Sequence, residues 1–252
     1  MPPSPAPTLV SIEGVRKAFR SGTVALDGVD LAVRRGDFLS ILGPSGCGKS
    51  TLLRLIAGLA EPSAGAIRGI EALQRRLSFV FQEPTLMPWA TVWDNVFLPL
   101  RLAGEARSSA EARIAGTLEA VGLGGFERAY PRELSGGMRM RVSIARALVT
   151  DPELLLLDEP FAALDEITRF RLNEDLLRLW EARHWTVVFV THSVFESAFL
   201  SSRVVLMAPR PGRVVADVPV DLPYPREGAL RTSAPYADFC RGLSERLAGA
   251  MA

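Results

Sequence analysis

The residues best suited to chemistry lie in the segment GPSGCGKST, at positions 43–51. The segment follows an apolar run, FLSIL, and opens an apolar helical pattern, STLLRLIAGL. It therefore matches G-x-x-x-x-G-K-[ST] in the strand, loop and helix setting that this motif needs. Glycines allow successive backbone N–H groups to point inward, and the helix N-terminus adds the positive end of its dipole. We predict a cradle for the phosphates of a nucleotide.

Several residues of this loop have individual expected roles. Lys49 can reach the β- and γ-phosphates, Ser50 offers a hydroxyl to Mg²⁺, and Thr51 offers a hydroxyl near the α-phosphate. Cys47 is interpreted as a small residue that fits the loop. The alternative is a glycine turn that binds nothing, which would leave the lysine and the hydroxyl unexplained. The predicted nucleotide-binding residues of the loop are Gly43, Pro44, Ser45, Gly46, Cys47, Gly48, Lys49, Ser50 and Thr51.

Two carboxylates follow another apolar run, in LLLLDEP at residues 154–160. A buried parallel strand exposes polar groups at its carboxyl end, where ligands bind in open α/β sheets. Asp158 is therefore expected on the Mg²⁺ side, and Glu159 is expected to face the γ-phosphate and polarise the attacking water. A pair of acids that caps a turn is the alternative. The phosphate loop upstream favours the catalytic interpretation.

Single polar residues follow two further apolar runs. Gln82 follows LSFVF and His192 follows TVVFV, so both are expected at the edge of the sheet where the nucleotide lies. Each would otherwise be interpreted as an ordinary surface residue. His192 is the better of the two histidines for contact with the γ-phosphate, because His184 sits in a helix-end context.

An α/β core with a helical insertion must position these residues. Short β-like runs fill residues 8–42, and helical periodicity dominates from about 87 to 150. We expect a disordered lead-in over 1–8 and a single domain over 9–210. RVVLMA, at 203–208, is expected to be the last strand. Residues 211–252 are expected to form a short C-terminal extension without a separate regulatory domain.

Bulk properties exclude several classes. The net charge of +1 gives no reason to expect nucleic acid as a partner. No apolar run approaches the roughly 18–20 residues that span a bilayer, and the first residues lack the pattern of a signal peptide. Two cysteines are too few for a disulfide framework, so a reduced, cytoplasmic setting is expected.

The order of the motifs carries a family resemblance. GPSGCGKST, Gln82, LSGGM at 134–138, LLLLDEP, AALD at 162–165 and His192 follow one another, and over roughly 8–210 the chain resembles the ATP-binding subunit of an ABC transporter. The resemblance implies an α/β P-loop NTPase core with an antiparallel β subdomain and an inserted α-helical subdomain. It also implies ATP hydrolysis, with ATP and Mg²⁺ bound.

The same resemblance assigns further roles. Phe19 would stack on adenine, although a core phenylalanine is the alternative. Gln82 would sense Mg²⁺ and water and link the site to a membrane partner, and Asp165 would cross a dimer interface. Glu159 would be the general base and His192 the switch histidine. The implied catalytic residues are Glu159, His192, Gln82 and Lys49, and the implied metal-site residues are Ser50, Gln82 and Asp158.

In this family two such chains pair head to tail over two ATP molecules. LSGGM of one chain, with Ser135, Gly136 and Gly137, would then cap the γ-phosphate held by the other. Backbone N–H groups at a helix N-terminus are an anion site, which gives the two glycines a purpose. A simple glycine turn before a helix is the alternative.

A narrower resemblance, to nitrate/sulfonate/taurine-type importer ATPases, lies in DEPFAALDEITR, LMPWATVWDNVFLPL and MAPRPGRVVADVPVDLPYPR. It implies a homodimer at the cytoplasmic face of the inner membrane, bound to integral-membrane permease subunits and served indirectly by a solute-binding protein. MPWATVWDNV, at 87–96, would line the groove for a permease helix, or its two tryptophans would be core. Met138 and Ser193 depart from the family pattern, in which glutamine and aspartate are common.

Two rival functions remain. A soluble, non-transport ABC ATPase would usually carry a long coiled-coil insertion or a second cassette, and a P-loop kinase would not explain LSGGM, AALD and His192 together. The solute is chosen by the permease and binding protein, so nitrate, sulfonates, taurine, bicarbonate, pyrimidine-like heterocycles and aromatic acids all fit this chain.

Overall fold

The computed structural model describes residues 6–73 and 76–250. Most of the predicted lead-in, residues 1–5, lies outside the described residues, and Thr8 already belongs to the first strand. That strand, β1 (Thr8–Ala18), lies between β2 (Val24–Arg34) and β4 (Ala64–Arg68) in an antiparallel three-stranded sheet. The predicted antiparallel β portion is confirmed.

A second sheet forms the centre of the molecule, with strand order β5-β6-β7-β3-β8-β9. Its strands are β3 (Phe38–Leu42), β5 (Leu77–Val80), β6 (Leu154–Asp158), β7 (Thr186–Thr191), β8 (Arg203–Ala208) and β9 (Arg213–Pro219). The first five strands in that order run parallel, and β9 runs antiparallel to β8. Every residue of β3, β6 and β7 is buried, as expected for parallel strands covered on both faces.

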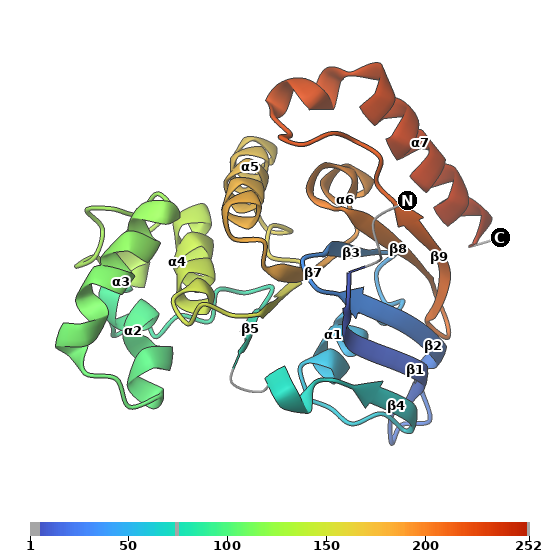
Figure 1. Ribbon diagram of the computed structural model, residues 1–252, viewed down its shortest axis with the longest axis horizontal. Helices are drawn as coiled ribbons and strands as arrows, with labels where there is room; N and C mark the ends of the chain where they lie inside the picture. Colours follow the sequence, from blue (N-terminus) through green and yellow to red (C-terminus); the bar gives the residue numbers. More distant parts are fainter. Residues whose placement is uncertain (1–5, 74–75, 251–252) are drawn as a thin grey trace.

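Helices cover the central sheet or stand beside it. Figure 1 shows α2, α3 and α4 gathered apart from the strands, as the predicted helical insertion requires. The helices are α1 (Lys49–Ile56), α2 (Val92–Leu102), α3 (Arg107–Ala120), α4 (Gly136–Leu148), α5 (Glu166–Arg183), α6 (Val194–Leu200) and α7 (Ala234–Gly249). None of the described helices is long and apolar enough to cross a membrane.

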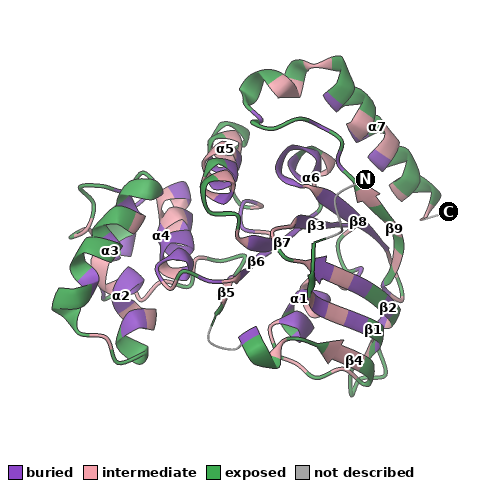
Figure 2. Ribbon diagram, viewed as in Figure 1, coloured by how far each residue is buried: buried purple, intermediate pink, exposed green. Residues whose placement is uncertain are grey.

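The prediction that β8 is the last strand is wrong. β9 adds a strand to the same sheet, and α7 packs over α6 near the C-terminus (Figure 1). In the sequence, the prolines of this segment disfavour a strand. In the structure, the side chains of the run RVVADVP alternate between exposed and half-buried along β9. The buried stripe of α7, Tyr236, Cys240 and Leu243, has helical spacing, and its purple bands in Figure 2 face the core.

The C-terminal segment is tied to α6 by specific bonds. The Tyr236 hydroxyl donates to the Phe195 carbonyl at 2.7 Å. The buried Arg226 guanidinium donates to the carbonyls of Ala198, Phe199 and Ser201, which end α6. Residues 211–250 are therefore integrated with the core.

Candidate nucleotide-binding site

The loop between β3 and α1 has the backbone that the sequence predicts. Gly46 and Gly48 have φ values of 78° and 96°, a left-handed region that glycine adopts without the usual cost. A Cβ atom at Gly43 would lie 2.6 Å from the Met207 carbonyl, so β8 leaves no room for a side chain there. The loop is therefore held close to the sheet, with the N-terminus of α1 opening at Lys49.

Lys49 is buried at the centre of this loop. Its Nζ donates to the carbonyl oxygens of Gly43 at 2.8 Å and Pro44 at 3.0 Å. The same atom lies 3.4 Å from Glu159 Oε1. The loop thus aims a cation across the cleft toward the end of β6, where the two predicted carboxylates lie.

Asp158 and Ser50 form an oxygen pair beside the lysine. The Ser50 hydroxyl donates to Asp158 Oδ1 at 2.7 Å. Burial raises the pKa of the Asp158 carboxyl, while the Ser50 hydrogen bond and the charge of Arg54 oppose that rise. A carboxylate and a hydroxyl are hard oxygen donors of the kind Mg²⁺ prefers, and a cation beside Asp158 would offset the cost of its buried charge. The residues present fit a magnesium ion.

Glu159 is held in a strained backbone position. Its φ of 45° is left-handed, and its N–H donates to the Val190 carbonyl of β7 at 3.0 Å. The carboxylate faces Lys49 through Oε1 and lies 3.1 Å from His192 Nδ1 through Oε2. His192 is 50% exposed, so its ring borders solvent. Such strain is typical of residues that a site requires in one orientation.

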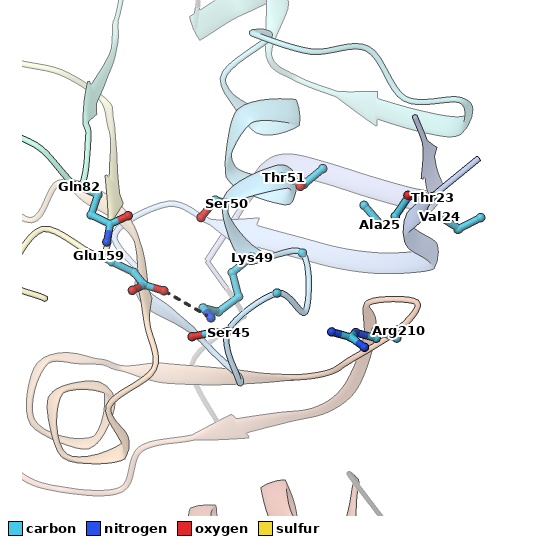
Figure 3. A pocket seen from close by; sticks show the side chains of 12 residues that line it. Thr23, Val24, Ala25, Ser45, Lys49, Ser50, Thr51, Gln82, Glu159 and Arg210 are labelled. Atoms are coloured by element: carbon cyan, nitrogen blue, oxygen red, sulfur yellow. Dashed lines mark ion pairs between the residues drawn. The ribbon is translucent and has the colours of Figure 1, made fainter. Parts of the chain in front are cut away.

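Lys49, Ser50 and Glu159 border a cavity of about 640 Å³, which is large enough for a nucleotide, whereas Asp158 and His192 lie behind these residues and do not line it. Figure 3 shows Gln82 and Glu159 at one end, Lys49 in the middle, and Thr23, Val24 and Ala25 at the other end. The lining residues are Thr23, Val24, Ala25, Ser45, Gly46, Gly48, Lys49, Ser50, Thr51, Gln82, Glu159 and Arg210.

Some predicted residues lie behind or beside this cavity. Gly43 and Pro44 present their carbonyls to Lys49, and Cys47 is buried, which raises the pKa of its thiol. Phe19 lies in the turn after β1, is 47% exposed, and has Lys17 Nζ 5.6 Å from its ring centre. Phe19 is thus a surface aromatic next to Thr23, and the alternative of a core phenylalanine is wrong.

The remaining predicted residues do not line the cavity among the described residues. Ser135 caps α4, with its Oγ accepting from Met138 N at 3.2 Å. Asp165 caps α5 by accepting from Thr168 N at 2.9 Å, and this bond lowers the pKa of the Asp165 carboxyl. Ser135 and Asp165 are both exposed, so a single chain leaves these two helix N-termini open to solvent.

The two departures from the family pattern have structural explanations. Ser193 caps α6, with its Oγ accepting from Glu196 N at 3.3 Å, which is a role that aspartate also fills. The side chain of Met138 packs against the main hydrophobic core. Neither Met138 nor Ser193 lines the cavity, so neither departure changes a group that faces it.

Four lining residues were not predicted. Three of them follow the turn that holds Phe19, namely Thr23, Val24 and Ala25. Their place shortly after that aromatic was the one signal in the sequence that they border the cavity. Arg210 lies in the turn between β8 and β9. Because the sequence interpretation ended the sheet at β8, it gave no reason to place this turn beside the phosphate loop.

Known proteins resemble this chain throughout. Residues 26–162 match the ABC transporter family. An aliphatic sulfonates import ATP-binding protein of Bacillus cereus is 45% identical over 224 residues, with 86% of this chain and 88% of that protein covered.

Solved structures share the fold. CbiO1 from Clostridium perfringens, part of an ABC transporter complex, has a TM-score of 0.77 at 26% identity, covering 94% of this chain and 99% of that chain. The ATP-binding cassette MJ0796, solved as a dimer in a post-hydrolysis state with ADP and Pi, has a TM-score of 0.75 at 32% identity, covering 84% and 99%. The chain belongs to the ABC transporter family and is an ATP-binding, ATP-hydrolysing subunit of that family.

Proposed function

We propose that this chain, as a homodimer, powers the uptake of a small solute of the sulfonate, nitrate or taurine kind through a separate membrane permease. The observation that carries the proposal is the cluster of Lys49, Ser50 and Glu159 around one cavity, with Asp158 hydrogen-bonded to Ser50 behind them. The similarity to an aliphatic sulfonate import protein over most of both chains supports the importer assignment.

Each residue of the cluster has a separate proposed role in hydrolysis. Lys49 would exchange its ion pair with Glu159 for the β- and γ-phosphates of ATP, which frees the Glu159 carboxylate to accept a proton from water. Ser50 and Asp158 would hold Mg²⁺, with Gln82 nearby in the lining. Bound Mg²⁺ would neutralise negative charge on the phosphate oxygens.

His192 would respond to a change at Glu159, because the two side chains are in contact. Its Nδ1 contacts Glu159 Oε2, and its loop leads directly into α6 through the Ser193 cap. A change at the γ-phosphate would therefore reach α6 through a short covalent path. The C-terminal segment holds α6 through Tyr236 and Arg226.

In the proposed dimer, each chain supplies phosphate-binding groups that the cavity of its partner lacks. The N-terminus of α4, with Ser135 and Gly136, presents backbone N–H groups that lie outside the cavity of their own chain. We propose that these groups cap the γ-phosphate held by the partner. A structural relative solved as a dimer, the cassette MJ0796, supports this arrangement.

The contact with the membrane partner is proposed at the segment 87–96. Trp89 is 75% exposed, which contradicts the alternative that both tryptophans are core. Trp93 is partly buried, packs against the core and carries the Arg107 guanidinium 3.9 Å from its ring centre. An exposed tryptophan shortly after Gln82 in the sequence suits a groove that receives a permease helix at the cytoplasmic membrane face.

Affinity purification from detergent-solubilised membranes tests the transport role. The native chain is expected to recover an integral permease, and Trp89→Ala is expected to lose it while ATP binding is retained. Leu102→Ala, which removes an exposed apolar side chain at the far end of α2, is the matched control and should keep the permease. Recovery of nucleic acid or ribosomes instead would favour a soluble, non-transport ABC ATPase.

A further inference from the structure

Arg210 forms one wall of the nucleotide cavity, although it lies far from the phosphate loop in the sequence. It belongs to the short turn that connects β8 to β9. In Figure 3 its guanidinium points toward the phosphate loop from the side of Thr23 and Val24. It lies across Lys49 from Glu159, toward the end of the cavity away from the two catalytic acids.

The turn that carries Arg210 is docked against β2 and the phosphate loop. Gly212 N donates to the Ala25 carbonyl at 2.9 Å, and Asp27 N donates to the Gly212 carbonyl at 3.1 Å. A Cβ atom at Gly212 would lie 2.1 Å from the Cys47 carbonyl, so only glycine allows so close an approach. The position of Arg210 beside the phosphate loop is therefore fixed by backbone contacts on both sides.

The backbone of Arg210 is itself strained. Its φ is 49°, in the left-handed region that costs a residue with a side chain about 1 kcal/mol. Among the described residues that line the cavity, Glu159 is the other non-glycine residue with a positive φ. Strain of this kind persists where the fold fixes a side chain in one direction, and functional sites are where it gathers.

The charges in the cavity leave Arg210 without a partner. Lys49 is paired with Glu159, and the neighbouring Arg213 is paired with Asp27 at 2.9 Å. Within residues 6–73 and 76–250, no acidic side chain lies within ion-pair distance of Arg210. The guanidinium is exposed to the cavity, so an anionic ligand can reach it without breaking an existing bond.

We propose that Arg210 is a further nucleotide-contacting residue, which binds a phosphate oxygen on the α-phosphate side of the chain of phosphates. This rests on the proposed function, which places the γ-phosphate beside Glu159. A guanidinium presents a planar fork of donors that matches a phosphate better than an ammonium does. Arg210 would hold the part of the phosphate chain that ATP and ADP share, so it sets affinity for both nucleotides and does not act on the hydrolysed bond.

Calorimetric titration of the full chain without Mg²⁺ tests this assignment. ATP, ADP and inorganic tripolyphosphate are each titrated into the native protein and into Arg210→Ala, Arg210→Lys and Arg213→Ala. Arg210→Ala is expected to weaken all three ligands by about tenfold, the size of one charge-assisted contact near solvent. Arg210→Lys should recover part of this loss. Arg213→Ala removes a nearby cation, at the start of β9, that does not line the cavity, and its affinities should stay within about twofold of the native protein.

Steady-state kinetics provide a second measurement. Because the contact is made equally to ATP and ADP, Arg210→Ala should raise KM for ATP by about tenfold while kcat falls much less. A large fall in kcat at unchanged KM would overturn the assignment.

Two binding outcomes would also overturn it. Native affinity for ATP and ADP in Arg210→Ala would show that the guanidinium makes no contact. Weaker binding of ATP and ADP with unchanged tripolyphosphate binding would place the contact at the base or ribose. In both cases the native protein still binds ATP, and the proposed function stands. A native protein that binds no nucleotide would contradict the proposed function itself, together with this assignment.

Discussion

The N-termini of α1 and α4 differ in what surrounds them. The N-terminus of α1 lies in one cavity with Glu159 and Arg210 of the β8–β9 turn, and its Ser50 is hydrogen-bonded to Asp158. The N-terminus of α4 carries a serine cap and two glycines, yet none of these three residues lines the cavity. The first site contains a cation, carboxylates and hydroxyls from its own chain. The second carries backbone donors and one hydroxyl, and in the proposed dimer it would act on a phosphate that another molecule supplies.

The largest expected effect separates chemistry from binding at the first site. Glu159→Gln removes the proton acceptor, so turnover should fall by at least about 100-fold, as expected for loss of general base catalysis. ATP affinity should be retained, because Lys49 and the loop remain. Steady phosphate release and equilibrium ATP binding measure the two effects. Glu166→Gln, an exposed acid on α5, is the matched control and should turn over normally. Comparable losses in both variants would contradict the role of Glu159.

The second expected effect concerns the buried carboxylate of the first site. Burial raises the pKa of Asp158, so its charged form is less stable in the folded protein than in the unfolded chain. Stability from this group is therefore greatest when it is protonated, and is lost as pH rises from its ordinary value through the raised native value. At neutral pH, Asp158→Asn should unfold at the same or a slightly higher temperature without Mg²⁺.

The same variant should lose turnover by about 100-fold, the scale of one lost electrostatic contact to the transition state. Thermal unfolding in the presence of a chelator and phosphate release in the presence of Mg²⁺ measure the two quantities. A variant that is both strongly destabilised and fully active would show that Asp158 is a structural acid.

A smaller effect is expected at the second site, with a matched control elsewhere in the chain. Ser135→Ala removes the cap of α4, and Ser233→Ala removes the corresponding cap of α7. Each should lower the free energy of unfolding by about 1 kcal/mol. Only Ser135→Ala should also reduce turnover, because its hydroxyl is proposed to face the partner's phosphate. Urea unfolding and phosphate release measure these effects, and equal turnover in both variants would contradict the asymmetry.

The smallest expected effect is at Met138. Its side chain packs against the core, and its backbone N–H donates to the Ser135 hydroxyl oxygen. Met138→Gln should therefore change ATP affinity and turnover by less than about twofold. Steady-state kinetics check this expectation, and a loss of tenfold or more would show that the side chain takes part in capping.

Sequence reasoning could bring the residues of the first site together because its parts are local. A contiguous loop determines its own backbone, and buried apolar strands place the residues that follow them at one edge of the sheet. Lys49, Asp158 and Glu159 could therefore be assigned to one site from the sequence alone.

The parts that sequence reasoning missed depend on distant pairing. Arg210 reaches the cavity only because β9 joins the sheet and Gly212 fits against the Cys47 carbonyl. The prolines of this segment suggested a tail, and the alternating burial of β9 was a weaker signal. The purpose of the α4 N-terminus cannot be read from one chain at all, because its proposed ligand belongs to a partner. Recognition of the family, and not local physics, supplied that expectation.

The most direct test of the central claim asks whether the α4 N-terminus completes the site of a second chain. Light scattering would compare Glu159→Gln with the same variant carrying Gly136→Asp, in the presence of ATP. A Cβ atom at Gly136 meets only side-chain atoms, Leu164 at 3.5 Å and Arg139 at 4.0 Å, so the added carboxylate fits its own chain. Gly116→Asp, at an open position on α3, is the matched control.

ATP should convert Glu159→Gln, with or without Gly116→Asp, into a dimer. With Gly136→Asp added, the chain should bind ATP with similar affinity and remain a monomer, because the carboxylate repels the partner's phosphate. A Glu159→Gln chain with Gly136→Asp that dimerises on ATP as readily as Glu159→Gln alone would contradict the claim that the two helix N-termini meet across the dimer.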